Sequence, residues 1–239
     1  MKYYIITGTS KGIGKALAEA LLLEPDTAVI GIARQQTITH KHYYHVALDL
    51  SQTQDLIANL PRVFREFKDA EELVLVNNAG VIGEIGYVGE KQPADFEYVF
   101  SVNVTAPAIL MNAFLETYRH LEIPKVILNI SSGAGKYPLD GWASYCASKA
   151  ALDLFSQTVQ EEQNLRNSGV KVFSIAPGVV DTEMQAQIRN AAEDQFSLHQ
   201  KFQEYKSSGS LASPETVGEK LKKLLLNLPE ELPVVSRLE

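Results

Sequence analysis

The sequence predicts a single α/β domain in which helices cover both faces of a parallel sheet. Short apolar runs rich in β-branched residues alternate with longer segments of helical period along the 239 residues. The runs are apolar at nearly every position rather than at alternate positions, which is typical of strands buried on both faces. Strands and helices that alternate in this way form βαβ units and a doubly wound sheet.

Seven strands and five helices are expected. The strands are predicted over residues 3–7, 28–33, 44–48, 73–77, 126–131, 170–175 and, with a weaker pattern, 233–235. The helices are predicted over residues 12–23, 53–67, 95–118, 142–165 and 214–227. The last helix has a clear start, because the Ser213 hydroxyl can cap it and Pro214 suits its first position.

No linker rich in Pro, Gly or Ser divides the chain, so one domain is expected over residues 1–239. Residues 183–210 interrupt the alternation, because they are polar and only weakly helical and follow the sixth strand. This segment is either a surface excursion or a flap that covers a bound ligand.

Composition narrows the class of protein. With 45% hydrophobic and 21% charged residues the chain is an ordinary globular protein. A net charge of −7 argues against a nucleic acid or an anionic membrane as partner. The single cysteine, Cys146, forms no intrachain disulfide, which fits a reducing cytoplasm. The apolar amino-terminal residues are too few for a signal peptide or a membrane span.

A glycine-rich loop joins the first strand to the first helix. It contains Gly8, Gly12 and Gly14. Glycine lets the backbone turn sharply and approach a pyrophosphate, and the helix that follows offers free N–H groups. The loop therefore predicts a dinucleotide site, although a tight turn without a ligand is the alternative.

Two basic residues favour NADPH over NADH. A fold that prefers NAD usually has an acidic residue at the end of the second strand, but this strand ends at Arg34. The Arg34 guanidinium can bind a 2′-phosphate, and Lys11 in the glycine loop can add a second charge. The alternative for each residue alone is a solvated surface position.

The glycine spacing and four later motifs resemble the classical short-chain dehydrogenase/reductase family, whose members have a single-domain Rossmann fold. The motifs are Asp49-Leu50, Asn77-Asn78-Ala79-Gly80, Tyr145-Cys146-Ala147-Ser148-Lys149 and the segment from Pro177 to Thr182, in the family's order. The resemblance implies that NADP(H) is bound by Gly8, Ser10, Lys11, Gly12, Ile13, Gly14, Arg34, Asp49, Leu50, Asn78, Ala79, Gly80, Tyr145, Lys149, Pro177, Gly178, Val180 and Thr182.

Tyr145 and Lys149 lie four residues apart in a predicted helix and hence on one face. With Ser132, thirteen residues earlier, and Asn103, they resemble the family's catalytic group. In that group Tyr145 is the general acid, Ser132 orients the carbonyl oxygen, and Asn103 positions a water that links Lys149 to solvent. A free phenol titrates near about pH 10, and a nearby Lys149 ammonium and the positively charged oxidised nicotinamide are both expected to lower that pKa. Ser131 is given a structural role.

An apolar and aromatic pocket is expected beside this group. Its wall would combine Ile82, Tyr137, Leu139, Trp142, Val179 and Met184, although each could instead belong to the core. Such a wall suits an apolar or aromatic carbonyl compound better than a small charged acid. The substrate is therefore expected to contact Ser132, Tyr137, Trp142, Tyr145 and Met184.

Two further features have simpler interpretations. His40, His42 and His45 could suggest a metal site, but no carboxylate or thiol nearby completes a ligand set, so a solvated loop is expected and no metal. Cys146 is expected to be a small packed residue.

Residues 141–151 and 181–185 resemble the sepiapterin reductase branch of the family, which includes bacterial benzil reductases. The carboxyl-terminal residues 232–239 give no clear acidic anchor for a pterin, so a diketone or general carbonyl substrate is expected. The alternatives are a 3-oxoacyl- or steroid-type reductase and, in another class, a non-catalytic NADPH-binding sensor. The presence of Ser132, Tyr145 and Lys149 counts against the sensor. The resemblance also implies a homodimer that pairs through the helices at 95–118 and 142–165.

Overall fold

The computed structural model describes residues 1–229 and 231–239. Its centre is a seven-stranded sheet in the order β3-β2-β1-β4-β5-β6-β7, in which each neighbouring pair is parallel. The strands are β1 (Lys2–Thr7), β2 (Thr27–Ala33), β3 (Tyr43–Ala47), β4 (Glu72–Asn77), β5 (Lys125–Ile130), β6 (Lys171–Ala176) and β7 (Val235–Arg237). The predicted doubly wound α/β fold with seven parallel strands is confirmed.

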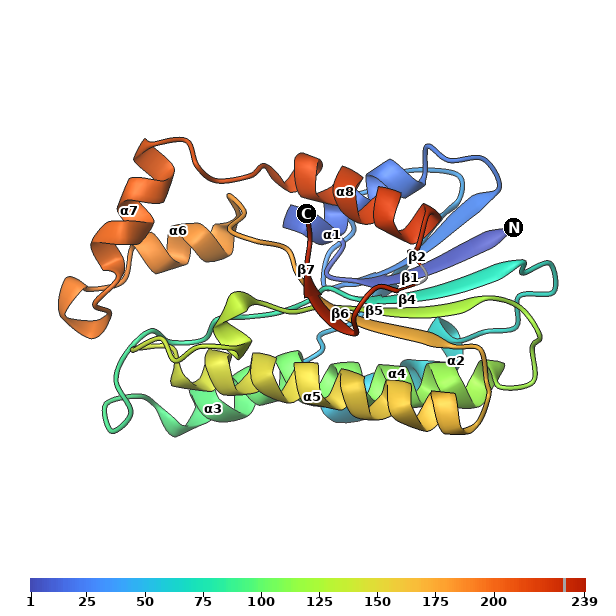
Figure 1. The fold of residues 1–239 in the computed structure, drawn as a ribbon, viewed down its shortest axis with the longest axis horizontal. Coiled ribbons are helices and arrows are strands. Elements are labelled where there is room, and N and C mark those ends of the chain that lie inside the picture. The colour runs from blue at the N-terminus through green and yellow to red at the C-terminus, as the bar shows by residue number, and fades with distance from the viewer. Residues whose placement is uncertain (230) are drawn as a thin grey trace.

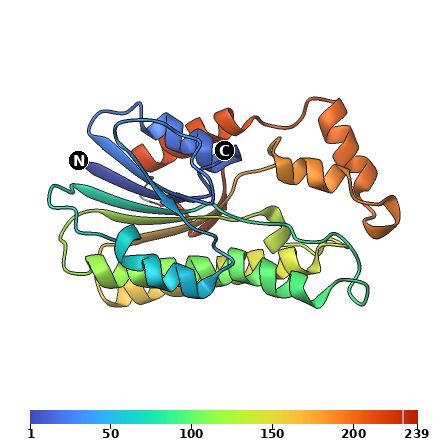
Figure 2. The same cartoon turned by 180° about the vertical axis from the view of Figure 1, so that it is seen from behind.

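Helices form a layer on each face of the sheet, as Figures 1 and 2 show from opposite sides. One layer contains α1 (Gly12–Leu21) and α8 (Pro214–Leu226), and the other contains α2 (Thr53–Val63), α4 (Ala106–Tyr118) and α5 (Ala143–Leu165). The helix α3 (Pro93–Phe100) leads into α4. Two further helices, α6 (Glu183–Arg189) and α7 (His199–Ser207), lie beyond the carboxyl ends of the strands (Figure 1).

The core has two main layers because alternate residues of each strand point to opposite faces. Tyr3 and Ile5 of β1 pack in the layer that contains α2 and α4, whereas Tyr4 and Ile6 pack in the layer that contains α1 and α8. Both layers are buried, which explains why the strands are apolar at nearly every position. A third cluster, which includes Trp142, joins the region of α6 and α7 to the start of α5.

The helix predicted over 53–67 ends earlier, at Val63. Pro61 has no N–H with which to continue the helical hydrogen bonds, and Phe64 leaves the helical conformation with φ −106° and ψ 70°. Phe64 and Phe67 are nevertheless buried, and both pack against Tyr118 of α4. Phe64 and Phe67 are apolar because they are buried in the loop after α2. In the sequence these two residues look like a continuation of the apolar face of the helix.

Two other elements differ from their predicted form. The helix predicted over 95–118 contains a π-helical turn, Ser101–Thr105, between α3 and α4. The last strand begins at Val235 rather than at Pro233, which has no N–H to donate to a sheet. The pairing of β7 with β6 therefore extends to Arg237, opposite Ala176.

The stretch Pro93–Tyr118 is long and apolar enough to cross a membrane by length and composition alone. Half of its most apolar window is buried inside the protein, however, and a core helix of a soluble protein passes the same test. Leu110, Met111 and Phe114 are fully buried against the sheet, so a place in the core accounts for this apolarity.

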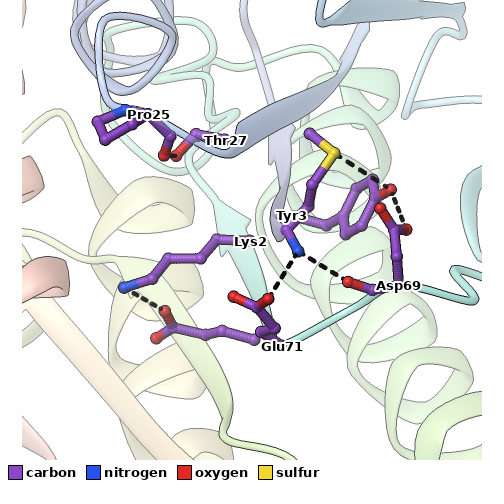
Figure 3. Close-up of polar contacts among 8 residues, drawn as sticks. Lys2, Tyr3, Pro25, Thr27, Asp69 and Glu71 are labelled. Carbon is purple, nitrogen blue, oxygen red and sulfur yellow. Dashed lines mark hydrogen bonds and ion pairs between the residues drawn. The ribbon is translucent and has the colours of Figure 1, made fainter.

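Polar contacts tie together the amino ends of the strands, away from the site described below (Figure 3). The Tyr3 hydroxyl donates to Asp69 Oδ1 at 2.7 Å, and the amino group of Met1 donates to the Asp69 carbonyl at 2.7 Å. The Tyr3 ring stacks on Phe67, with 4.1 Å between ring centres. Burial and the Asp69 carboxylate raise the pKa of Tyr3 to about 12, so this hydroxyl stays a donor at neutral pH.

Candidate active site

A cavity of about 1030 Å³ extends along the carboxyl ends of the strands. Its walls are the loops that follow β1 to β6, the end of β7, and residues of α6 and α7. The predicted site residues come from most of these segments, so the sheet brings together side chains that lie far apart in the sequence.

Hydrogen bonds hold the glycine loop against the loop after β4. The Thr7 hydroxyl accepts from the backbone N–H groups of Asn78 and Ala79, each at 2.9 Å. The Asn78 side-chain amide donates to the Thr7 carbonyl at 2.9 Å. The two loops therefore form one surface at the centre of the cavity.

Two glycines in this loop have no room for a side chain. A Cβ atom on Gly8, where φ is +75°, would lie 2.8 Å from Asn78 Nδ2, and a Cβ atom on Gly14 would lie 2.3 Å from the same atom. The close packing leaves the backbone of the loop open toward the amino terminus of α1, as a pyrophosphate requires. Gly14 itself lies behind the loop, whereas the other predicted dinucleotide residues line the cavity.

The two predicted phosphate-binding cations have different surroundings. Arg34 lines the cavity at the end of β2 and is exposed. Lys11 forms an ion pair with Glu183 at the start of α6. Asp49, after β3, accepts from the backbone N–H of Ser51 at 2.9 Å and from its hydroxyl at 2.8 Å, which fixes the turn there.

Ser132, Tyr145 and Lys149 line the same cavity. Tyr145 and Lys149 are 7% and 4% exposed, and the Lys149 ammonium lies 5.7 Å from the centre of the Tyr145 ring. Lys149 Nζ also donates to the carbonyl of Ile130 at the end of β5, at 2.9 Å. Ser132 Oγ accepts from the N–H of Ala134 at 3.2 Å, which caps the short turn Gly133–Gly135 and fixes this side chain.

Burial has the largest effect on the pKa values of Tyr145 and Lys149. It raises the pKa of Tyr145 to about 12, and the nearby Ser132 hydroxyl offsets only part of that rise. Burial also lowers the pKa of Lys149 to about 8, which the charge of Asp153 opposes. The expectation that Lys149 lowers the pKa of Tyr145 is therefore wrong for the protein alone, because burial is the largest influence on this pKa and the Ser132 hydroxyl, not Lys149, is the group that opposes it.

Asn103 lies in the π-helical turn and is fully buried. Its amide accepts from the N–H of Val81 at 2.9 Å and donates to the Val81 carbonyl at 2.8 Å and to Ser148 Oγ at 3.0 Å. A Cβ atom on Gly80 would lie 3.4 Å from both Asn103 Oδ1 and Lys149 Nζ. Asn103 is thus placed near Lys149 but behind the cavity wall.

The segment after β6 approaches the glycine loop from the opposite side of the cavity. Pro177, Gly178, Val180 and Thr182 line it, and the Thr182 methyl lies 3.5 Å from where a Cβ atom on Gly12 would be. Asp181 forms ion pairs with Lys206 at 2.6 Å and with Arg189 at 3.8 Å. These contacts attach the end of α6 and the end of α7 to the same loop.

The far end of the cavity is apolar and aromatic. The six predicted wall residues all line it, namely Ile82, Tyr137, Leu139, Trp142, Val179 and Met184. The Trp142 indole stacks on Phe196, with 4.9 Å between ring centres, and meets the Tyr145 ring edge-on at 5.9 Å. Trp142 therefore connects residues 183–210 directly to Tyr145.

Asp140 anchors the tip of the same segment. Its carboxylate accepts from the backbone N–H of Ser197 at 2.8 Å and from the Ser197 hydroxyl at 2.7 Å. Hydrogen bonds from Ser197 and Tyr87 hold the pKa of the Asp140 carboxyl below its usual value, although partial burial opposes them. A Cβ atom on Gly141 would lie 2.4 Å from the carbonyl of Gln195, so the two segments are in close contact.

Several cavity residues were not singled out from the sequence. They include Tyr98, Gln185, Gln187, Ile188, Phe202 and Arg237. The spacing of the few apolar residues in 183–210 could have indicated Ile188 and Phe202. Nothing in the sequence pattern indicated Arg237, because only the pairing of β7 with β6 brings it to the cavity.

Three further features that the sequence analysis considered are a metal site, Cys146 and Ser131. Within residues 1–229 and 231–239, no group of three or more His, Cys, Asp or Glu side chains could hold a metal ion. Cys146 is a half-buried free thiol. Ser131 lines the cavity, and its buried hydroxyl has no hydrogen-bond partner among the described residues.

Comparison with known proteins agrees with this geometry. The sequence profile of the family described as short chain dehydrogenase matches residues 2–193. A benzil reductase ((S)-benzoin forming) of Bacillus cereus is 37% identical over 98% of this chain and 96% of its own length. A sepiapterin reductase of Meriones unguiculatus is 31% identical over 92% of this chain and 90% of its own. The crystal structure of the KRED1-Pglu enzyme superposes with a TM-score of 0.86 at 27% identity, covering 99% of this chain and 100% of that one.

The fold and the cavity thus define an oxidoreductase of the class that binds nicotinamide dinucleotides at the carboxyl ends of a parallel sheet. The chain belongs to the short-chain dehydrogenase/reductase family, and the predicted membership is confirmed.

The Thr7 hydroxyl provides a test of the loop structure. Thr7→Val keeps the side-chain shape but leaves the Ala79 N–H without its acceptor and the Asn78 N–H with only the Val76 carbonyl, which costs about 1–3 kcal/mol of stability. We expect a lower urea midpoint and weaker binding of the dinucleotide in calorimetric titration. Thr7→Ser, which keeps the hydroxyl, should retain binding, and equal losses in both variants would contradict this role.

Proposed function

We propose that this protein is an NADPH-dependent reductase of ketones and vicinal diketones, including benzil-like compounds. The observation that carries the proposal is that Ser132, Tyr145 and Lys149 line one cavity with the glycine loop. The names of the relatives, benzil reductase and sepiapterin reductase, agree with a carbonyl substrate.

Each residue has a chemical role in this proposal. NADPH held along the glycine loop would supply a hydride to the carbonyl carbon, and negative charge would then develop on the carbonyl oxygen. The Tyr145 hydroxyl, protonated because burial raises its pKa, donates its proton to that oxygen. Ser132 donates a hydrogen bond that orients the oxygen. Lys149 returns a proton to Tyr145, and Asn103 holds the water that links Lys149 to solvent.

Residues 183–210 act as a substrate flap in this proposal, within one domain that spans residues 1–239. Met184, Ile188 and Phe202 of this segment line the cavity beside Trp142. An aromatic diketone would lie between them and the Tyr145 ring, shielded from water. Exclusion of water strengthens the interaction of the developing oxyanion with its donors.

A homodimer and a cytoplasmic location complete the proposal. Leu154 and Phe155 of α5 are 65% and 37% exposed, as expected for a helix that pairs with a second copy. Tyr98 and Phe100 of α3 are also partly exposed.

Tyr145→Phe is the direct test of the reaction. Loss of the proton donor should lower kcat for benzil roughly 100- to 10,000-fold, while the affinity for NADPH stays close to the wild-type value. Turnover is followed by NADPH oxidation and binding by calorimetry. Tyr44→Phe removes a phenol from an exposed position on β3 that does not line the cavity, and it should retain activity. Normal turnover by the Tyr145 variant would exclude this mechanism.

The pKa of Lys149 predicts how the reaction depends on pH. Lys149 can return a proton only while charged, so kcat should be constant at low pH and fall as pH rises through the pKa of about 8. Tyr145, with a pKa of about 12, stays protonated over this range. Asp153→Asn removes a charge that raises the Lys149 pKa and should move the descending limb to lower pH. A rate that increases with pH would contradict the assignment.

Arg34 provides the test of cofactor preference. Arg34→Asp removes a charged hydrogen-bond donor and adds a repulsive charge, so kcat/KM for NADPH should fall roughly 10- to 100-fold relative to NADH. Arg119→Asp, at an exposed position on α4's carboxyl end, makes the same change in net charge and serves as control. An unchanged NADPH to NADH ratio in the Arg34 variant would count against the assignment.

A further inference from the structure

The end of the last strand places a guanidinium group in the cavity. Arg237 lines the cavity, and its Nη2 atom lies 3.8 Å from where a Cβ atom on Gly178 would be. The backbone on both sides of Arg237 is held by the sheet, since Arg237 pairs with Ala176 and the N–H of Leu238 donates to the Ala176 carbonyl at 3.0 Å. The position of this cation is therefore set by a strand rather than by a free chain end.

Strand register shows which face of the sheet Arg237 occupies. Paired residues in a parallel sheet point to the same face, and so do alternate residues of one strand. Ser174 of β6 donates to Asp153 of α5 at 2.6 Å, so Ser174 and Ala176 face the α5 layer. Arg237, paired with Ala176, faces the same layer, and Tyr145 and Lys149 come from that layer.

The strand order separates Arg237 from the proposed 2′-phosphate site. Arg34 follows β2, which is next to one edge of the sheet, whereas β7 forms the opposite edge. The glycine loop follows β1, between them. The cavity thus has one guanidinium on each side of the glycine loop, and Arg237 is on the side of β5 and β6, where Ser132 and the Pro177 segment lie.

Arg237 is an exposed residue, and its charge has no partner among the described residues. Within the described part of the chain its guanidinium forms no ion pair and no side-chain hydrogen bond. Of the described carboxylates that line the cavity, Glu183 pairs with Lys11 and Asp181 with Lys206, whereas Asp49 follows β3 at the edge of the sheet opposite β7. In a protein of net charge −7, an unpaired guanidinium in a ligand cavity favours an anionic ligand group.

We infer that Arg237 binds a carboxylate carried by the carbonyl substrate, so that the substrates of this site include keto acids. This inference rests on the proposed function and adds a substrate class to it. The aromatic wall would hold the apolar part of such a compound, and Arg237 would hold the charged part on the β7 side. A planar guanidinium suits this role because it can donate two parallel hydrogen bonds to one carboxylate.

The test compares a charged keto acid with its uncharged methyl ester. Phenylglyoxylate and its methyl ester contain the same aryl ketone, but only the acid is an anion. Each is titrated calorimetrically into the wild-type protein and into Arg237→Gln, both saturated with NADP+, which cannot reduce the ketone. We expect Arg237→Gln to weaken binding of the acid roughly 10- to 100-fold and to change binding of the ester less than about threefold. The acids 4-oxo-4-phenylbutyrate and 5-oxo-5-phenylpentanoate, each with its ester, show at which spacing the effect is largest.

Arg166→Gln is the matched control, because Arg166 is exposed at the end of α5 and does not line the cavity. Equal binding of acid and ester to both proteins, at each spacing, would overturn the inference. So would weaker binding of NADP+ to Arg237→Gln without discrimination between acid and ester, since the bound anion would then be a cofactor phosphate. Charge-dependent binding without reduction of any carbonyl by NADPH would uphold the inference while the proposed reductase function failed.

Discussion

All seven strands of the sheet run in the same direction, and the position of the site follows from this constraint. Parallel strands end at one edge, so the loops that follow β1, β4, β5 and β6 meet although their sequences lie far apart. The backbone polar groups at these ends have no further strand to pair with. Side chains such as Thr7 and Asn78 satisfy them and join the loops into one surface.

Close packing within this surface explains its composition. Gly8 and Gly14 surround the Asn78 amide so closely that a Cβ atom at either position would collide with it. The same packing holds the loop backbone close to the amino terminus of α1. The first N–H groups of a helix have no acceptor within the helix and can bind an anion. Glycine at positions 8 and 14 is therefore required both for the packing against Asn78 and for the loop shape that suits an anion.

The low polarity around Tyr145 and Lys149 determines their protonation. Both side chains are almost completely buried, and burial acts in opposite directions on a phenol and an amine. It keeps Tyr145 protonated and brings the pKa of Lys149 near the physiological range. Trp142 provides part of this environment and also stacks on Phe196, so the packing of residues 183–210 directly affects the surroundings of Tyr145.

Properties that depend on short stretches of chain could be predicted from the sequence. The apolar runs of the strands, the spacing of Gly8, Gly12 and Gly14, and the four-residue spacing of Tyr145 and Lys149 each reflect local geometry. The early end of α2 could not be predicted, because Phe64 and Phe67 are apolar for packing against α4 rather than for helical burial. The raised pKa of Tyr145 and the arrival of Arg237 at the cavity were also decided only by tertiary structure. Burial and strand pairing depend on residues distant in sequence, and no local pattern encodes the distances between them.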